Sequence, residues 1–321
     1  MTSARDFRFS TNFMGLRGRD AVVAYAKRVE ELGYDTLFAA DHLGSTAPFQ
    51  MLIAAAGVTS RLRLGTLVLN VPFWNPALLA REIVTADQLT DGRLEVGLGS
   101  GHMKWEFDAA SIPWEGFGAR ASRLEETIAE ISTILSRGGY AERRQVEEHF
   151  NLKPLAPLQE SGFGGYGPPL LVAGTGERVL RIAARYADII GIAGTKQITG
   201  RAPGAFRLCT AAETDDVVRF ARAEAGSRAD SVEWNVLVQL VKETGDRLGV
   251  AAEVATEDDA TMTPQEVMET PFLLFGTVDE MAAQVLRNRE RFGFTYYTVH
   301  GHYMEAFAPV IERVRALAAR D

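Results

Sequence analysis

Four of the five histidines come directly after, or end, segments that have the composition of β-strands. His42 follows DTLFAA, His102 follows LEVGLGSG, and His300 and His302 come after FTYYTV. In a (β/α)8 barrel the carboxyl ends of the strands meet at one rim, where enzymes of this architecture have their active sites. Imidazole gains and loses a proton near neutral pH. The pattern therefore predicts an enzyme whose chemistry lies at that rim.

Two glycine-containing turns could bind a cofactor. The turn GSG at 99–101 ends a predicted strand, and a backbone without Cβ atoms lets a flat ring or a phosphate approach closely, although a tight barrel turn would look the same. The sequence GTG at 174–176 precedes a helical run, 177–187, whose first N–H groups could bind an anion. A dinucleotide-binding turn is not predicted, because the third glycine is missing and Asp188 comes too early to be the ribose ligand.

Aromatic and cationic side chains follow other predicted strands. The aromatic side chains favour an apolar substrate pocket over a simple cap on the core; they are Phe73, Trp74, Trp105, Phe107 and Trp114. Lys196, Arg201 and Arg207 lie after the sixth strand. They are either a solvated loop or a clamp for a negatively charged cofactor tail.

Metal and thiol chemistry are not predicted. His300 and His302 are two residues apart, but no acidic residue completes a known ligand spacing, so we expect no metal. The single cysteine, Cys209, excludes an internal disulfide, fits a reducing compartment and has no partner motif, so an inert thiol is expected.

Strand-like and helix-like segments alternate along the chain, which is typical of βαβ units and a parallel sheet. Helical stripes such as those at 21–32 and 119–135 would cover the outside of a barrel. The length of 321 residues suits one domain, 1–321, with insertions at about 138–169 and 194–214. The eight predicted strands are 8–13, 35–40, 63–70, 93–99, 170–173, 188–193, 231–241 and 294–300.

Composition narrows the possible partners. The net charge of −8 opposes binding to nucleic acid, which needs many cations to neutralise phosphates. No signal peptide and no membrane-spanning run is recognised, so a cytoplasmic protein that does not enter a membrane is expected. A small organic molecule is the expected partner.

Three motifs resemble the bacterial luciferase-like superfamily, and within it the oxidoreductases that depend on the deazaflavin coenzyme F420. They are the block from RLGTLV at 63–68 to NPALLAREIVTADQLTDGRLEVGLGSG at 75–101, the DH pair at 41–42, and PPLLVAGTGERVLRIAARYADIIGIA at 168–193. The resemblance implies a (β/α)8 TIM barrel, a homodimer, and a cofactor ring lying across the carboxyl-terminal rim.

The resemblance also assigns roles. His42, with Asp41 beside it, would be the acid or base at the ring, and a non-proline cis peptide near 67–68, or as far as 70–71, would support the back of the ring. Apart from the resemblance, the position of His102, Trp74, Trp105 and His300 after strands at the predicted rim leads us to expect that they face the substrate. The expected cofactor-binding residues are Leu67, Val68, Asn70, Gly99, Ser100, Gly101, Ala173, Gly174, Thr175, Gly176, Ala193 and Lys196.

The sequence therefore favours an F420-dependent oxidoreductase that moves a hydride between the deazaflavin and an organic substrate. Two alternatives remain open. One is an FMN-dependent monooxygenase on the same barrel, and the other is a chromophore-binding protein without catalysis.

Overall fold

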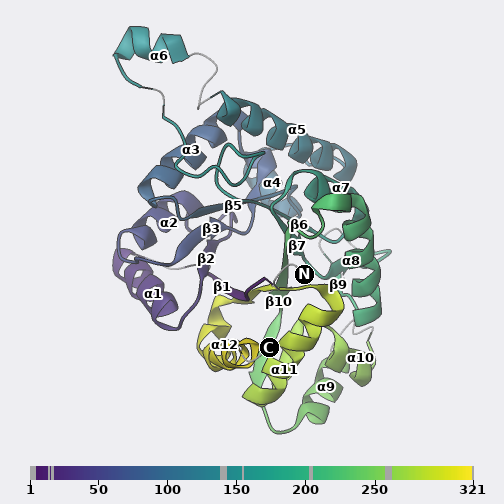
Figure 1. The fold of residues 1–321 in the computed structure, drawn as a ribbon. Coiled ribbons are helices and arrows are strands. Elements are labelled where there is room, and N and C mark those ends of the chain that lie inside the picture. The colour runs from purple at the N-terminus through teal and green to yellow at the C-terminus, as the bar shows by residue number, and fades with distance from the viewer. Residues whose placement is uncertain are drawn as a thin grey trace.

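The computed structural model describes residues 5–13, 15, 18–137, 143–153, 155–201, 205–256 and 262–319. Within these residues eight parallel strands form a closed barrel surrounded by helices (Figure 1), which confirms the predicted fold. The barrel closes because β13 pairs with β1 and β3 pairs with β5. The barrel strands are β1 (Arg8–Phe13), β2 (Thr36–Ala39), β3 (Arg63–Thr66) with its continuation β4 (Leu69–Asn70), β5 (Leu94–Gly99), β6 (Leu170–Gly174), β7 (Ile189–Ile192), β10 (Glu233–Val238) and β13 (Tyr296–His300).

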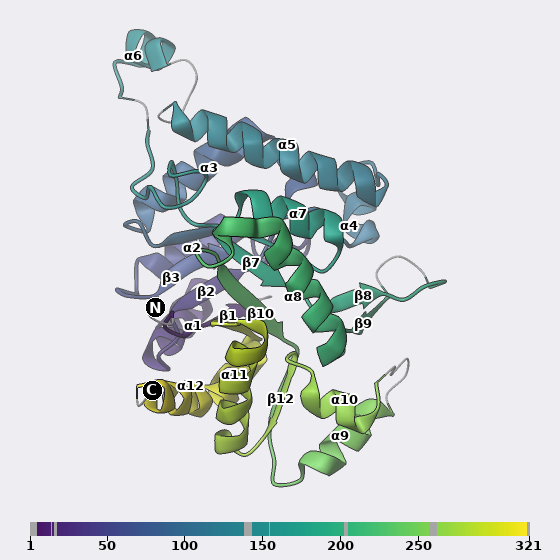
Figure 2. The same cartoon turned by 45° about the vertical axis from the view of Figure 1, so that its right-hand side comes forward.

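Helices cover the outer face of the barrel, as two views show (Figures 1 and 2). Local sequence fixes where several of them begin. Thr210 and Glu213 form a capping box at the start of α8, and Asn75 caps α3 just before a proline. The covering helices are α1 (Arg19–Glu31), α2 (Pro48–Ala56), α3 (Pro76–Leu89), α5 (Phe117–Ser136), α7 (Glu177–Tyr186), α8 (Ala211–Ala225), α11 (Val278–Phe292) and α12 (Met304–Ala318).

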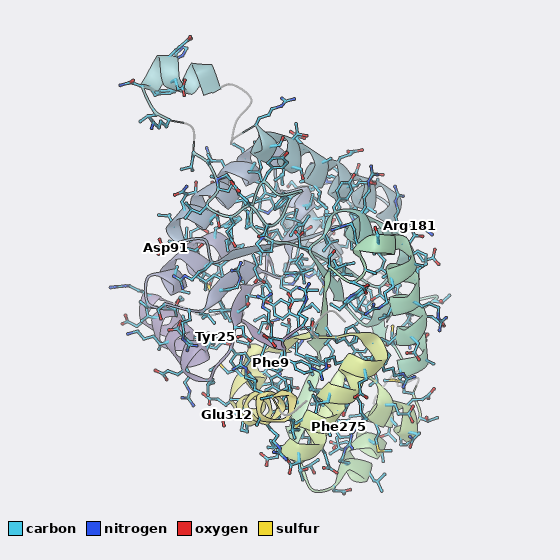
Figure 3. All side chains as sticks on the ribbon, in the orientation of Figure 1. Phe9, Tyr25, Asp91, Arg181, Phe275 and Glu312 are labelled. Atoms are coloured by element: carbon cyan, nitrogen blue, oxygen red, sulfur yellow. The ribbon has the colours of Figure 1, made fainter. Side chains whose placement is uncertain are left out.

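Alternation along β1 divides the barrel interior from the helix layer. Phe9 is fully buried and contacts Phe307 of α12 at a ring distance of 5.9 Å, so this side of β1 faces the helices. Glu312 on α12 and Arg181 on α7 instead extend from the outer surface (Figure 3). The opposite side of β1 carries polar residues into the barrel, from Arg8 at one end to Asn12 at the other.

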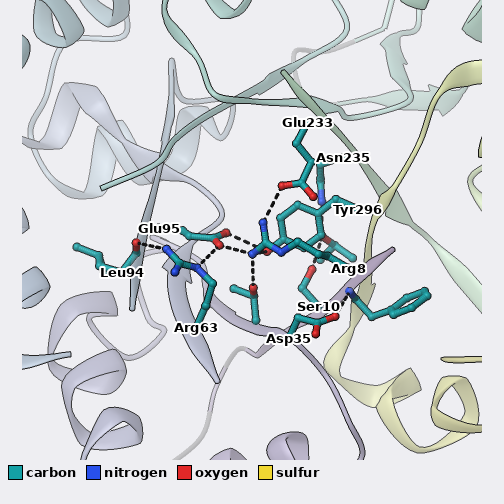
Figure 4. Close-up of polar contacts among 12 residues, drawn as sticks. Arg8, Ser10, Asp35, Arg63, Leu94, Glu95, Glu233, Asn235 and Tyr296 are labelled. Atoms are coloured by element: carbon teal, nitrogen blue, oxygen red, sulfur yellow. Dashed lines mark hydrogen bonds and ion pairs between the residues drawn. The ribbon is translucent and has the colours of Figure 1, made fainter. Parts of the chain in front are cut away.

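An ion cluster fills the amino-terminal end of the barrel (Figure 4). Arg8 binds Glu233 at 2.7 Å and also binds Glu95, which receives a second guanidinium from Arg63 at 2.6 Å. The hydroxyl of Tyr296 donates to Glu95 at 3.0 Å. A small apolar cluster that includes Phe38, Leu171 and Ile189 packs with the Tyr296 ring. The carboxyl-terminal end is therefore the open end of the barrel.

Three segments depart from the repeating pattern. After α5 come a short helix, α6 (Arg143–Phe150), which projects from the body in Figures 1 and 2, and an isolated bridge between Gly162 and Gly167. After β7 an antiparallel hairpin forms from β8 (Thr195–Gln197) and β9 (Phe206–Leu208). Both segments lie in the predicted insertions. Outside these segments, the connection from β5 to α5 also contains a small helix, α4 (Lys104–Ala109).

The third departure corrects the sequence analysis. The predicted strand 231–241 is two strands, because the chain leaves the barrel after Val238 and continues as β11 (Leu240–Glu243). β11 pairs with β12 (Leu273–Gly276) instead of with a barrel strand. Between them lie α9 (Arg247–Ala255) and α10 (Pro264–Glu269). A separate apolar cluster around Phe275 stabilises this unit. The break was concealed because apolar residues stand on both sides of Gln239, where the chain changes sheet.

Candidate functional site

A cavity of about 1140 Å³ opens at the carboxyl-terminal ends of the barrel strands. Most of the predicted site residues line it, from every side of the barrel. They are Asp41, His42, Leu67, Val68, Asn70, Gly99, Ser100, Gly101, His102, Ala173, Gly174, Thr175, Gly176, Ala193, Lys196 and His300. Trp74 and Trp105 lie outside the lining.

His42 is held by a carboxylate that the sequence analysis did not identify. Its Nδ1 lies 2.8 Å from Oε1 of Glu106, a residue of α4 that is 1% exposed. The same oxygen accepts the backbone N–H of Leu43 at 3.0 Å. An acidic residue inside a short helix is usually at the surface. Only the fold, which places α4 over the end of β2, shows that Glu106 belongs to the site.

Asp41 holds two loops together. Its Oδ2 accepts hydrogen bonds from the backbone N–H of Asn70 at 3.0 Å and from Nε1 of Trp74 at 2.9 Å. Burial raises the pKa of Asp41, although these two hydrogen bonds lower it in part. Trp74 also packs edge-on against Phe49 at 5.8 Å. Trp74 therefore lies outside the cavity lining and joins Asp41 to Phe49.

One wall of the cavity is made of closely packed backbone around the Leu67–Val68 peptide. The peptide between Leu67 and Val68 is cis, at the first of the expected positions. Gly99 lies against it, since a Cβ atom at Gly99 would be 2.5 Å from Cγ2 of Val68. At Gly101, where φ is +77°, a Cβ atom would be 2.4 Å from Oδ1 of Asn70. Glycine is needed at both places because the neighbouring chain already occupies the space of a side chain.

Three of the four histidines at this rim, His42, His102 and His300, line the cavity, whereas His302 does not, contrary to the expectation that all four would open onto it. The ring of His102 meets that of His42 edge-on at 5.6 Å and lies 6.3 Å from Phe206 of the hairpin. Burial lowers the pKa of His102, and likewise that of His300. His302 is exposed outside the lining and stacks on His300 at 5.9 Å. The turn after β13 carries the two rings to different environments.

A second part of the cavity can receive an anion. The first turn of α7 has no side-chain cap, and Oγ1 of Thr175 just before it is buried without a hydrogen-bond partner. Arg120 of α5, only 6% exposed, also lines the cavity, stacks over Trp114 at 3.7 Å and has a buried Nε without a partner. Sequence analysis missed Arg120 because it falls on a helix that the periodicity assigned to the outer layer.

The cations of the hairpin are partly neutralised by one carboxylate. Glu213 binds Lys196 at 3.1 Å and Arg207 at 2.6 Å. The hydrogen bond from Arg207 lowers the pKa of Glu213 to about 2. Lys196 and Arg201 line the cavity, whereas Arg207 does not. Only two of the three cations expected to hold a cofactor tail therefore line the cavity.

The predicted aromatic residues lie in different places. Trp114 lines the cavity, and Phe107 is fully buried behind it at a ring distance of 4.8 Å. Phe73 packs against Phe107 at 5.4 Å. Trp105 is 55% exposed and outside the lining, so the structure gives no support to its expected contact with substrate. Neighbouring helical positions face different directions, which the sequence pattern around α4 did not resolve.

Other chemistries have less support. Across the described part of the chain, no group of three His, Cys, Asp or Glu side chains is arranged to hold a metal ion. Burial raises the pKa of the Cys209 thiol to about 11. None of the helices in the described residues is long and apolar enough to span a membrane.

Residues 14–296 match the family described as luciferase-like monooxygenase. The chain belongs to this family. The match begins just after β1 and ends at the first residue of β13, so it includes the six barrel strands between them. The motifs at 41–42, 63–101 and 168–193 had indicated the same family.

Named relatives of this luciferase-like chain include enzymes with two kinds of cofactor. An F420-dependent glucose-6-phosphate dehydrogenase of Amycolatopsis mediterranei is 31% identical over 52% of this chain and 51% of its own length, about half of each. One of the same name from Beutenbergia cavernae is 27% identical over 92% and 93%. An FMNH2-dependent dimethylsulfone monooxygenase of Pseudomonas fluorescens is 34% identical over 42% and 35%.

Solved structures agree with the barrel over nearly its whole length. An F420-dependent secondary alcohol dehydrogenase superposes with a TM-score of 0.67 at 16% identity, covering 97% of this chain and 99% of the other. A long-chain alkane monooxygenase gives a TM-score of 0.71 at 14% identity, covering 98% and 92%. At such low identity these likenesses show the fold alone.

Proposed function

We propose that this luciferase-like protein is an oxidoreductase that uses coenzyme F420 and moves a hydride between that cofactor and a small organic substrate. The observation that carries the proposal is the pairing of His42 with the buried Glu106 at the mouth of a cavity with a flat glycine-lined wall. The F420-dependent relatives support this choice of cofactor, including the one aligned over most of its length.

The residues present fit such a cofactor. Val68 and Gly99 form a wall with no room for another side chain, which suits the face of a planar ring. Oγ1 of Thr175 and Nε of Arg120 are buried polar atoms without partners, and a phosphate beside the uncapped start of α7 would satisfy both. When bound, the deazaflavin supplies a ring carbon that accepts or donates a hydride.

His42 is proposed to hold the proton that accompanies the hydride. Oε1 of Glu106 already accepts the Leu43 N–H, so it acts as an acceptor toward Nδ1 of His42 as well. The proton of neutral His42 therefore lies on Nδ1, and Nε2 keeps a free lone pair. In one direction the substrate loses a hydride to the cofactor and a proton to Nε2. In the other direction it gains both, so charge and electrons balance.

FMN remains the second candidate cofactor. The FMNH2-dependent relative favours it, and the glycine wall and the anion site would accept an isoalloxazine phosphate as well. The hairpin distinguishes the two, because Lys196 and Arg201 at the cavity would meet the longer anionic tail of F420 and add little for FMN.

A binding titration tests the choice of cofactor. Purified protein is titrated with oxidised F420 and with FMN, and binding is followed by absorbance at low and high ionic strength. The proposal predicts tighter binding of F420, weakened by salt. Tight FMN binding together with no binding of F420 would overturn it. A variant with Lys196 and Arg201 both replaced by Met should lose about 2- to 10-fold of F420 affinity at low salt and nothing for FMN.

A further inference from the structure

His300 lies between two amide side chains in the wall of the cavity. Its Nδ1 is 3.3 Å from Nδ2 of Asn12, and its Nε2 is 3.1 Å from Oε1 of Gln239. The two amides come from the strand regions on either side of β13, since Asn12 belongs to β1 and Gln239 directly follows β10. Both ring nitrogens are therefore occupied, which leaves His300 no free nitrogen for proton transfer.

The hydrogen-bond network fixes the direction of each bond. Oδ1 of Asn12 accepts the backbone N–H of Gly301 at 3.3 Å, so the Asn12 atom facing His300 is the NH2 group. An NH2 group only donates, so Nδ1 of His300 accepts. The ring proton of neutral His300 must then lie on Nε2, where it is donated to Oε1 of Gln239.

Local features maintain this arrangement. A Cβ atom at Gly301 would be 2.4 Å from the backbone oxygen of Asn12, so only glycine allows the chain to come this close after β13. Burial and the neighbouring His302 both lower the pKa of His300, which favours its neutral form. Among the described residues no carboxylate forms an ion pair with His300.

We infer that Gln239 is a hydrogen-bond donor that holds a carbonyl oxygen of the bound ligand, and that His300 is the positioning residue that orients it. Because Oε1 of Gln239 faces His300, its NH2 group is the end that remains available. Gln239 is half-buried, lines the cavity, and its NH2 group has no partner among the described residues. A neutral donor selects a carbonyl or hydroxyl oxygen over a cation.

The place of Gln239 in the barrel determines which part of a ligand it can meet. In the order of the strands, β10 lies four places from β3, so Gln239 faces the Leu67–Val68 wall across the cavity. A carbonyl of the cofactor ring edge or of the substrate could reach it, and the two sources share the same chemistry. The identity of the ligand in this inference rests on the proposed function. The orientation of the Gln239 side chain is independent of the proposed function.

The orientation is tested without any ligand. Protein with ¹⁵N-labelled histidine gives imidazole signals from only five residues, and the His300→Gln variant identifies those of His300. We expect the neutral form with the proton on Nε2 at about pH 8, and a pKa below that of a free imidazole, about 6.5. The Asn12→Asp variant should put a proton on Nδ1 at neutral pH, because a carboxylate accepts where the amide donated. A wild-type ring with the proton on Nδ1, or one that titrates like a free imidazole, would overturn the inference.

Binding then tests the donor. Gln239→Met removes the NH2 group at similar size, and Gln265→Met on the exposed α10 is the matched control. The probes are oxidised F420 alone and cyclohexanone added to the protein–F420 complex. We expect Gln239→Met to weaken one probe by about 2- to 10-fold, which is the value of one hydrogen bond, and the control to weaken neither.

The affected probe identifies the source of the carbonyl. Weaker F420 binding assigns it to the cofactor, and weaker cyclohexanone binding with unchanged F420 affinity assigns it to the substrate. A folded Gln239→Met protein that binds both probes normally would overturn the inference. Wild-type protein that binds neither probe would instead overturn the proposed function, and the His300 signals in that sample still decide the orientation of Gln239.

Discussion

Replacing Arg8 by methionine should destabilise the protein strongly while leaving its cavity intact. Arg8 lies at the amino-terminal end of the barrel and binds both Glu95, which is fully buried, and Glu233, which is 3% exposed. Removing one member of a buried ion pair leaves its partner charged without compensation, which costs about 3–5 kcal/mol. Arg63 still binds Glu95, so the main loss is at Glu233 and the lower part of this range is expected.

The assay is unfolding in urea at neutral pH, with the free energy of unfolding extrapolated to water. The control is Arg5→Met, because Arg5 is 4.0 Å from Glu233 but its side chain is 43% exposed, and such a surface pair contributes at most about 1 kcal/mol. Adding Glu233→Gln to Arg8→Met should recover part of the loss, since the uncompensated charge is then gone. The reasoning would be refuted if Arg8→Met and Arg5→Met cost the same.

Three further outcomes follow from contacts within the described chain. Gly99→Ala should cost about 1–3 kcal/mol of stability and weaken F420 binding, because its Cβ would be 2.5 Å from Val68. Gly245→Ala, exposed, outside the cavity lining and with nothing within 4 Å of its Cβ, should change neither quantity, and equal effects would contradict this. Cys209 is 1% exposed, and burial raises the pKa of its thiol to about 11. It should therefore react with a thiol reagent much more slowly in native protein than in urea. Similar rates in the two conditions would argue against its burial. The hydrogen bond from Arg207 lowers the pKa of Glu213 to about 2, below about 4.3 in an unfolded chain, so the pair stabilises the fold above about pH 4.3 and this stabilisation is lost as the pH falls toward 2. Glu213→Gln should therefore flatten the pH dependence of unfolding over that interval, and an unchanged slope would count against the pair.

The barrel could be predicted because its strands are short apolar runs between helical patterns with regular spacing. The prediction failed at 231–241, where apolar residues on both sides of Gln239 belong to different sheets. The hydrophobicity of Val238 and Val241 indicates that both are buried, but it does not indicate which strand each residue pairs with. Pairing between residues distant in the chain is decided by the whole fold, so the excursion from β11 to β12 had no local signal.

Site residues that belong to a sequence motif could be predicted. Site residues whose position in the cavity wall depends on the tertiary structure could not. His42 and the turn at 99–101 stand at strand ends, and the alternation of strands and helices places such residues at one rim. Glu106, Arg120 and Gln239 are polar residues of types that are usually exposed, and only the tertiary structure puts them into the cavity wall. Trp105, an aromatic residue after the fourth barrel strand, is 55% exposed and lies outside the cavity lining, which its sequence position does not indicate.

The central claim is that the cavity binds F420 and uses it for hydride transfer with His42 as the proton carrier. The most direct measurement is an anaerobic single turnover, in which the protein with reduced F420 is mixed with a panel of carbonyl compounds and the absorbance of oxidised F420 is followed. The account predicts oxidation of the cofactor by some members of the panel without oxygen, slowed about 10²- to 10⁴-fold in His42→Ala at unchanged F420 affinity. No oxidation of bound F420 without oxygen, together with oxygen-dependent consumption of reduced FMN, or an equal rate in His42→Ala, would contradict it.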